Sequence, residues 1–138
     1  MSGLWYAIAL ASCGRADDAY GIVDRLAKAH PNNAGTQYAL FMKYALQGNK
    51  EKAFEQMTPE FIRCHRNNGI SAYMVAGLFA LLNEKERAFE WLEYAVNRGF
   101  ANYPLFREPL PFFAGIRGEE RFQRLLERVK YEWEHFEV

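Results

Sequence analysis

The chain has 138 residues, of which 50% are apolar and 16% aromatic, so it has enough apolar material for a core and is not disordered through low hydrophobicity. At roughly 100 to 200 residues per domain, this length fits one domain or a short repeat array and excludes a multidomain enzyme. The 17 basic and 17 acidic residues balance, which argues against nucleic acid as a direct partner. Two cysteines, Cys13 and Cys64, are too few for a disulfide framework and fit a reducing compartment, taken here as the cytoplasm.

The first segment, residues 3–13, is apolar on nearly every side, with Ser12 as its one polar side chain before the cysteine. It lacks the basic start of a signal peptide, and it is far shorter than the roughly 20 residues that a membrane span needs. We therefore expect a buried helix here and no membrane partner. A signal located upstream in a longer parent chain stays an alternative.

A seven-residue motif then occurs three times along the chain. It occupies residues 14–20, 48–54 and 83–89. Each copy starts with Gly or Asn, continues with charged residues and ends with alanine and a bulky apolar side chain. The three alanines, Ala19, Ala53 and Ala88, are 34 and 35 residues apart, which is the period of a helix-turn-helix repeat.

Each copy of the motif is expected to join two helices. Gly14, Gly48 and Asn83 follow apolar runs, and these residue types adopt the left-handed conformation that ends a helix. The helix after Asn83 has apolar residues at helical spacing with polar residues between them, so one of its faces is exposed. The apolar positions are Ala88, Phe89, Leu92, Ala95 and Val96. The helix before it, residues 70–82, carries only Ser71 as a polar side chain, which predicts apolar inner helices backed by amphipathic outer ones.

Two segments depart from this regular pattern. Thr58-Pro59 interrupts the outer helix of the second pair, and because proline suits the start of a helix after a threonine cap, a new helix is expected near residues 59–66. Residues 99–117 contain three prolines and two glycines, which favours an irregular crossing rich in aromatic residues. A capping helix over residues 118–136 follows. Its predicted apolar stripe is Phe122, Leu125, Leu126, Val129, Trp133 and Phe136.

The repeat period, the helix pairs, the three alanines and Pro31-Asn32-Asn33 at the end of the first pair resemble tetratricopeptide repeats. The resemblance covers about residues 1–98. It implies an all-α, right-handed superhelix of three helix pairs plus the capping helix, in a single domain over residues 1–138. The repeats are expected at about residues 1–33, 34–67 and 68–98. The first unit lacks the family's usual tryptophan, and the second departs from the pattern at Thr58-Pro59.

The remainder of the chain resembles the closing segment of tetratricopeptide regions in larger bacterial proteins. The residues that carry this resemblance are Arg98-Gly99-Phe100, Asn102-Tyr103-Pro104-Leu105, Gly118-Glu119-Glu120-Arg121-Phe122 and Glu132-Trp133-Glu134. Such regions often follow a signalling kinase or a DNA-binding regulatory domain, so the chain resembles the C-terminal piece of a longer protein.

The sequence predicts no catalytic residues, metal ligands or cofactor. Its histidines, His30, His65 and His135, are far apart along the chain. Cys64 and His65 are adjacent, so on a helix they point about 100° apart, and no second pair completes a metal site. An enzymatic function is therefore the weakest of three hypotheses, after a protein-interaction module and a structural or sensory domain.

Stacked helix pairs form a concave inner surface, and its chemistry here is aromatic and thioether. The residues predicted to line it are Leu4, Trp5, Ile8, Tyr38, Met42, Tyr73, Met74 and Gly77. Some tetratricopeptide proteins hold a peptide carboxylate with lysines and asparagines. The matching places in this chain are Leu4, Ile8, Ala39, Tyr73 and Met74, so the expected ligand is an apolar peptide or helix.

The predicted function is a non-catalytic protein-interaction module with an unidentified protein or peptide partner. Two alternatives stay open at this point. The crossing at residues 100–113 could fold back and fill the groove. The apolar first helix could instead pair with a second copy through Leu4, Trp5 and Ile8, as in a structural or sensory dimerisation domain that regulates a kinase or DNA-binding domain of the parent.

Overall fold

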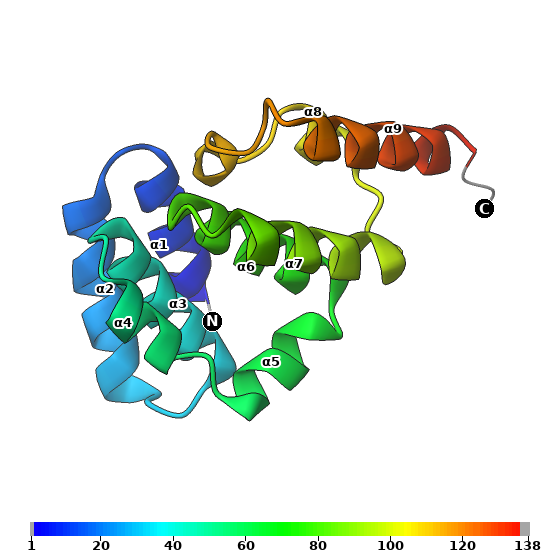
Figure 1. Cartoon of the computed structure of the whole chain (residues 1–138). Coiled ribbons are helices and arrows are strands. Elements are labelled where there is room, and N and C mark those ends of the chain that lie inside the picture. Colours follow the sequence, from blue (N-terminus) through cyan, green and yellow to red (C-terminus); the bar gives the residue numbers. More distant parts are fainter. Residues whose placement is uncertain (1, 136–138) are drawn as a thin grey trace. The chain divides into compact units, whose positions relative to one another are not determined.

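The structure is a computed structural model that describes residues 2–135, with the backbone alone described for Ser2. This part of the chain is helical and contains no strand, so the expected all-α class is confirmed (Figure 1). It divides into two compact units with the boundary after Cys64. We call residues 1–64 unit 1 and residues 65–138 unit 2. The single domain expected over the whole chain stays a prediction.

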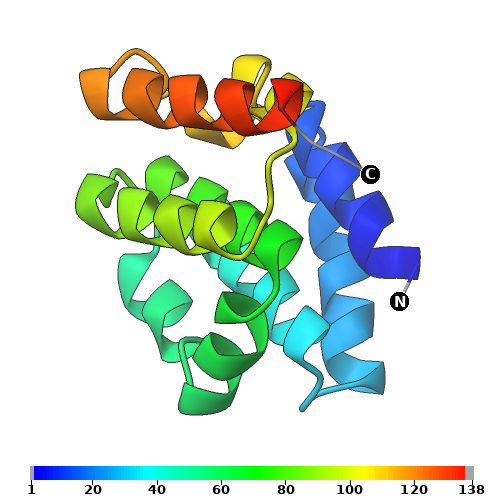
Figure 2. The ribbon, with the colours of Figure 1, turned by 90° about the vertical axis from the view of Figure 1, so that its right-hand side faces the viewer.

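Unit 1 contains two helix pairs and the start of a further helix. Its elements are α1 (Ser2–Ser12), α2 (Ala16–Ala29), α3 (Ala34–Leu46), α4 (Lys50–Glu55) and most of α5 (Pro59–Arg66). Helix α1 packs against both α2 and α3, and α3 packs against α4. Figure 2 shows α1 and α2 side by side along their lengths.

Unit 2 contains one long helix pair and a C-terminal part that packs on it. Its elements are the end of α5, α6 (Gly69–Leu81), α7 (Lys85–Asn97), α8 (Tyr103–Arg107), a 3-10 helix (Pro111–Phe113) and α9 (Glu120–Glu134). Helices α6 and α7 form the most extensive helix contact of this unit, the 3-10 helix packs on α6, and α9 packs on α7 and α8 (Figures 1 and 2).

The turns within the three helix pairs have the predicted left-handed residues. The φ angles are 79° at Gly14, 72° at Gly48 and 60° at Asn83. Glycine adopts this conformation without steric cost, and asparagine is among the few other residues that tolerate it. The recurring alanines that follow these turns, Ala19, Ala53 and Ala88, are fully buried, because a small side chain there lets the two helices approach each other. The predicted left-handed turns are therefore confirmed.

The predicted break in the second pair is confirmed as well. Helix α4 ends at Glu55 and α5 begins at Pro59, and the hydroxyl oxygen of Thr58 accepts a hydrogen bond from the Phe61 backbone N–H at 3.1 Å. The break lets the Phe61 ring stack on Phe41, with 6.1 Å between the ring centroids and 11° between the planes.

The crossing after α7 is more regular than expected, because α8 forms within it. The side chain of Asn102 accepts a hydrogen bond from the Leu105 backbone N–H at 3.3 Å, and Pro104 lies in the first turn of the helix, where its missing N–H costs nothing. Pro104 and Pro111 therefore lie at the starts of short helices. The rest of residues 99–117 forms turns and irregular structure, as predicted.

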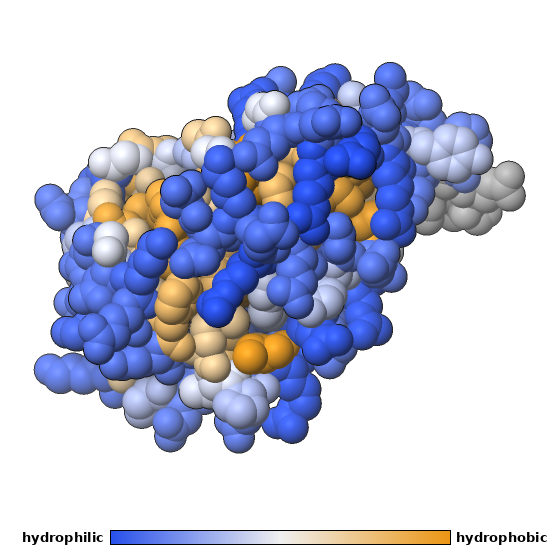
Figure 3. All heavy atoms as spheres, viewed as in Figure 1, coloured by the Kyte–Doolittle hydropathy of each residue, from blue (hydrophilic) through white to orange (hydrophobic). Residues whose placement is uncertain are grey.

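Helix α9 covers α7 much as predicted. Phe122, Leu125 and Val129 are buried, whereas Trp133 is 50% exposed and Phe136 lies outside the described residues. The prediction of a buried Trp133 is therefore wrong, because the stripe runs past the elements that cover its earlier part. Figure 3 shows charged side chains crossing an apolar seam between α7 and α9. Two of the ion pairs there join Lys85 to Glu119 and Arg121 to Glu86, each at 2.9 Å.

No helix among residues 2–135 is both long enough and apolar enough to cross a bilayer.

Candidate interaction surface

The eight residues predicted to line a groove fall into both units. Unit 1 holds Leu4, Trp5, Ile8, Tyr38 and Met42, and unit 2 holds Tyr73, Met74 and Gly77. Six of the eight are buried. Leu4 is half-buried, and Trp5, with 55% of its surface exposed, is the one that clearly faces solvent.

In unit 2, the predicted groove face of α6 is filled by the chain itself. The Tyr73 hydroxyl donates a hydrogen bond to the Leu105 carbonyl at 2.9 Å, and the Tyr73 ring lies 4.9 Å from Phe113 and 5.4 Å from Phe106, centroid to centroid. A Cβ atom at Gly77 would lie 3.2 Å from Cε2 of Phe113. The crossing therefore occupies this face, and Tyr73, Met74 and Gly77 do not present an open surface. Of the two alternatives left open, folding back is the one seen here.

The environment of Tyr73 also changes its acidity. Burial raises the pKa of Tyr73 to about 12, because the charged phenolate would lose its hydration, and the Leu110 backbone offsets part of this rise. The hydroxyl therefore stays neutral and acts as a hydrogen-bond donor at physiological pH. Its role in unit 2 is that of a core residue.

In unit 1, Ile8, Tyr38 and Met42 are core residues too. Tyr38 is 3% exposed, and burial raises the pKa of its hydroxyl far above the ordinary range. Replacing Tyr38 or Tyr73 by alanine would therefore remove a core side chain, so these two residues cannot report on ligand binding separately from folding.

An open groove does lie in unit 1, between the first two helices. We call it the α1–α2 groove. It is a hollow of about 330 Å³ lined by Gly3, Tyr6, Ile22, Arg25, Leu26, Ala29 and His30. Gly3 faces α2, because a Cβ atom there would lie 3.6 Å from Cδ2 of Leu26 and 3.7 Å from Cγ2 of Ile22, in ordinary van der Waals contact. The start of α1 and the end of α2 thus form the groove together.

The groove has an apolar floor and an aromatic edge. Ile22 is 8% exposed and Leu26 is half-buried, whereas Tyr6 has 59% of its surface in solvent. Trp5, which precedes Tyr6 in α1, is 55% exposed but does not line the groove. Large aromatic side chains that stay exposed beside an apolar floor are typical of interaction sites, because they offer a large contact area for little loss of conformational freedom.

The polar groups of the groove are basic or neutral. Arg25 is exposed, and its Nε donates a hydrogen bond to the Gly21 carbonyl at 3.4 Å within the same helix. His30 follows α2 directly and is exposed as well. The surface therefore offers apolar contact together with hydrogen-bond donors, which is chemistry suited to binding.

None of the eight residues predicted to bind a ligand lines this groove, because the prediction assigned ligand contact to the first helix of each pair alone. A signal was present in α2, where Ile22, Leu26 and Ala29 recur at helical spacing next to Arg25. The outer helix of the first pair therefore supplies most of the residues that line the groove, and the inner helix supplies Gly3 and Tyr6.

Unit 2 has a second hollow, of about 480 Å³, at the end of α9. It is lined by Gly99, Phe100, Ala101, Asn102, Glu132 and Trp133. Within the part of the chain that the structure describes, no three His, Cys, Asp or Glu side chains are grouped so that they could hold a metal ion. Cys13 and Cys64 are both exposed thiols.

The fold and the groove together define an all-α protein with an exposed aromatic and apolar surface on its first helix pair. A comparison with family models, curated proteins and solved structures finds no match to this chain.

Proposed function

We propose that this chain is a non-catalytic module of tetratricopeptide type that binds a helix of a partner protein in the α1–α2 groove, in the cytoplasm. The repeat assignment is supported by three helix pairs whose left-handed turn residues recur at intervals of 34 and 35 residues, Gly14, Gly48 and Asn83. A right-handed superhelix is the arrangement that we propose for these pairs.

The observation that carries the binding function is the difference between α1 and α6. The face of α6 that bears Tyr73 and Gly77 is covered by the chain's own aromatic residues, whereas Tyr6, which lines the α1–α2 groove, remains in solvent. An apolar groove between two helices accepts a third helix, which lays its apolar stripe along the floor. We therefore place the partner at the α1–α2 groove.

A second candidate function is self-association, and exposed Trp5 is the observation that favours it. In this candidate, Leu4 and Trp5 would meet a second copy, and the domain would regulate a kinase or DNA-binding domain of a longer parent protein. Ile8 would contribute little, because it is 6% exposed. Light scattering over a concentration series separates the two functions, since a dimer has twice the 16.0 kDa of the chain.

The binding function can be tested with a neutral helical peptide. A suitable probe has about 16 residues, long enough for four helical turns, with leucines along one stripe and glutamine or alanine elsewhere. Calorimetric titration of the full chain should show saturable binding with one peptide per chain. Tyr6→Glu should abolish it, because the variant loses the aromatic contact at the edge of the groove and places a hydrated carboxylate over the apolar floor.

Tyr131→Glu is the matched control. Tyr131 is 63% exposed and belongs to unit 2, so this variant makes the same chemical change on a comparably exposed tyrosine. It should bind the peptide as the parent chain does. Equal affinities of the two variants, or no saturable binding by the parent chain, would overturn the proposed site.

A further inference from the structure

The charges of the chain balance overall, but they are not evenly distributed. The sequence contains no Asp or Glu in residues 1–16 and none in residues 25–50, whereas Arg25, Lys28 and His30 all lie at the end of α2. The acidic residue nearest to this region along the chain, Asp24, accepts a hydrogen bond from Lys43 at 2.8 Å. The end of unit 1 that contains the α1–α2 groove is therefore apolar and cationic.

The lining of the groove has the same bias. Arg25 and His30 line it, and no carboxylate does. The guanidinium of Arg25 has five N–H donors, and the structure gives it one intrahelical acceptor, the Gly21 carbonyl at 3.4 Å. An arginine in this position can take a carboxylate with two parallel hydrogen bonds, which a lysine cannot do with the same geometry.

We propose that the α1–α2 groove takes an amphipathic helix whose apolar stripe is flanked by Glu or Asp. This inference rests on the proposed function and adds the charge of the partner. The apolar stripe of the bound helix lies on Ile22, Leu26 and Ala29. The edge of the bound helix contacts Tyr6, and its flanking carboxylates contact Arg25 and His30. A helix flanked by Lys or Arg is disfavoured, because its charges would approach like charges that have no carboxylate beside them in the groove.

Three peptides that share one leucine stripe test the charge. They carry Glu, Gln or Lys at the positions that flank the stripe, and each is titrated into the full chain at low ionic strength. Exposed ion pairs are weak individually, so we expect the Glu peptide to bind about fivefold to tenfold more tightly than the Lys peptide, with the Gln peptide between them. Added salt should reduce this ratio toward one.

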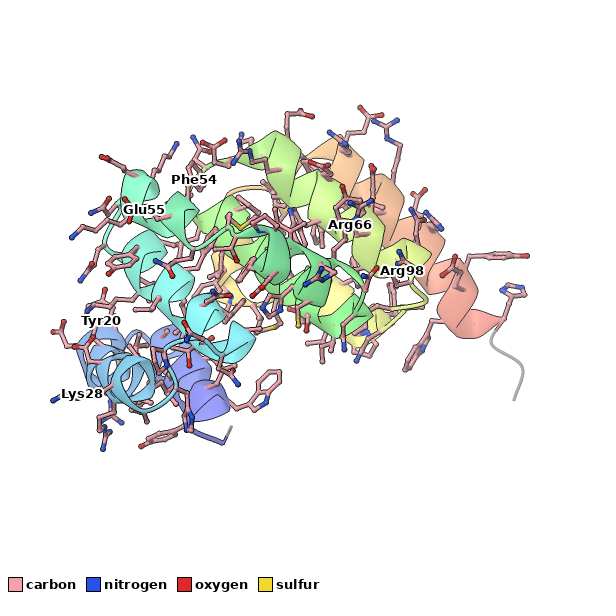
Figure 4. The ribbon with its side chains drawn as sticks, turned by 90° about the horizontal axis from the view of Figure 1, so that it is seen from below. Tyr20, Lys28, Phe54, Glu55, Arg66 and Arg98 are labelled. Atoms are coloured by element: carbon pink, nitrogen blue, oxygen red, sulfur yellow. The ribbon has the colours of Figure 1, made fainter. Side chains whose placement is uncertain are left out.

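Arg25→Glu is the variant that isolates the proposed contact. It should reverse the order, so that the Lys peptide binds most tightly, while the Gln peptide changes little. Lys28→Glu is the matched control, since it makes the same change of charge on the same helix at a side chain that points outward from α2 (Figure 4) and does not line the groove. Lys28→Glu should reduce the ratio of the affinities for the Glu and Lys peptides without reversing their order.

The peptide titrations can overturn the charge preference alone or the proposed function with it. Equal affinities for the Glu and Lys peptides, with binding of the Gln peptide intact, would overturn the charge preference and leave the proposed function in place. The same order in Arg25→Glu as in the parent chain would also overturn it, because Arg25 would not be the contact. No binding of any of the three peptides would overturn both proposals. A molar mass that rises with concentration and falls to the monomer in Tyr6→Glu would show that a second copy is the occupant, and would overturn the inference.

Discussion

Helices α1 and α6 have nearly the same composition and very different surroundings. Both are apolar on almost every side, yet α6 buries every residue from Ala72 to Ala80, whereas α1 leaves Trp5 and Tyr6 in solvent. The reason is the part of the chain that follows each pair. After α7, the crossing returns and places Phe113 against Gly77, and in unit 1 the segment after α2 forms α3 instead. An apolar helix thus shows that some surface must cover it, without showing which surface, because the hydrophobic effect has no direction.

Two glycines in these helices illustrate the same difference. Gly77 leaves room for the edge of an aromatic ring that comes from elsewhere in unit 2, where a Cβ atom would be crowded. At Gly3 a Cβ atom would make only ordinary contacts with α2, and the residue lines a hollow. Gly77 therefore lies on a helix face that the chain fills, and Gly3 lies on a face that stays open. The four predictions below test this contrast, from the largest expected effect to the smallest.

Removing the ring that fills the α6 face should have the largest effect. Phe113 is fully buried, and its ring lies 4.9 Å from Tyr73 and 6.3 Å from Phe122, so Phe113→Ala should cost about 3–5 kcal/mol of stability in unit 2. Hydrogen exchange measured by mass spectrometry should show faster exchange in peptides from α6 and α7. Tyr103→Ala, a change in the same crossing at a half-buried residue, is the control. An equally small loss in both variants would mean that the crossing does not fill this face.

A methyl group added at Gly77 should destabilise, while one added at Gly21 should stabilise. At Gly77 the new Cβ would lie 3.2 Å from the Phe113 ring, and overpacking of this kind costs about 1–3 kcal/mol, partly offset by the better helix propensity of alanine. At Gly21 nothing lies within 4 Å, so Gly21→Ala should gain about 0.5–1 kcal/mol. Urea unfolding of both variants measures whether each change lowers or raises the free energy of unfolding. A Gly77→Ala variant that is more stable than the parent chain would contradict a filled α6 face.

Tyr73→Phe should have a moderate effect that depends on pH. Loss of the hydrogen bond to the Leu105 carbonyl should cost about 0.5–1.5 kcal/mol at neutral pH. Because the pKa of Tyr73 is raised to about 12 in the folded chain, against an ordinary value of about 10, its contribution is complete below pH 10 and is lost as the pH rises toward 12.

The measurement for this prediction is the difference in unfolding free energy between the parent chain and Tyr73→Phe, followed from pH 8 to pH 12. Other tyrosines titrate in both proteins, so the difference isolates Tyr73. It should shrink or change sign above about pH 10. A difference that stays constant over the whole range would show that the hydroxyl is not buried as described.

Trp5→Ala should have the smallest effect on the isolated chain. A side chain that is 55% exposed contributes little to the fold, so the free energy of unfolding should stay within about 0.5 kcal/mol of the parent value at low protein concentration. Thermal unfolding at several concentrations is the measurement. A larger loss that grows with protein concentration would mean that Trp5 is covered by a second copy, and would favour self-association over helix binding.

Several features of the fold could be predicted because their causes are local. A glycine or asparagine after an apolar run ends a helix, and Thr58 before Pro59 starts one, through interactions among residues only a few positions apart. The buried stripe of α7 followed from helical spacing for the same reason. No residue that lines the groove was predicted, but exposed Trp5 next to Tyr6 was identified from the excess of apolar side chains in residues 3–13, which is a local feature as well.

The rest of the site could not be predicted, because it depends on which distant residues meet. Tyr73 and Gly77 carry no mark that distinguishes a groove residue from a core residue until Phe113 is placed on them. Arg25 reads as one charge of an amphipathic helix until α1 is placed beside α2. Helix α8 was missed for a different reason, since the prediction for residues 99–117 rested on the three prolines and two glycines and did not consider Asn102 as a helix cap.

The sequence by itself determined the all-α class, the helix pairs and their turns, since backbone conformation and the spacing of apolar residues act within a few turns of helix. Only the tertiary structure decided which apolar face is filled and which is open. That decision depends on packing between segments that are far apart in the chain, where Phe113 lies on Gly77 and the end of α2 lies beside Gly3. The same apolar composition thus forms a closed core in one helix pair and the floor of a groove in another.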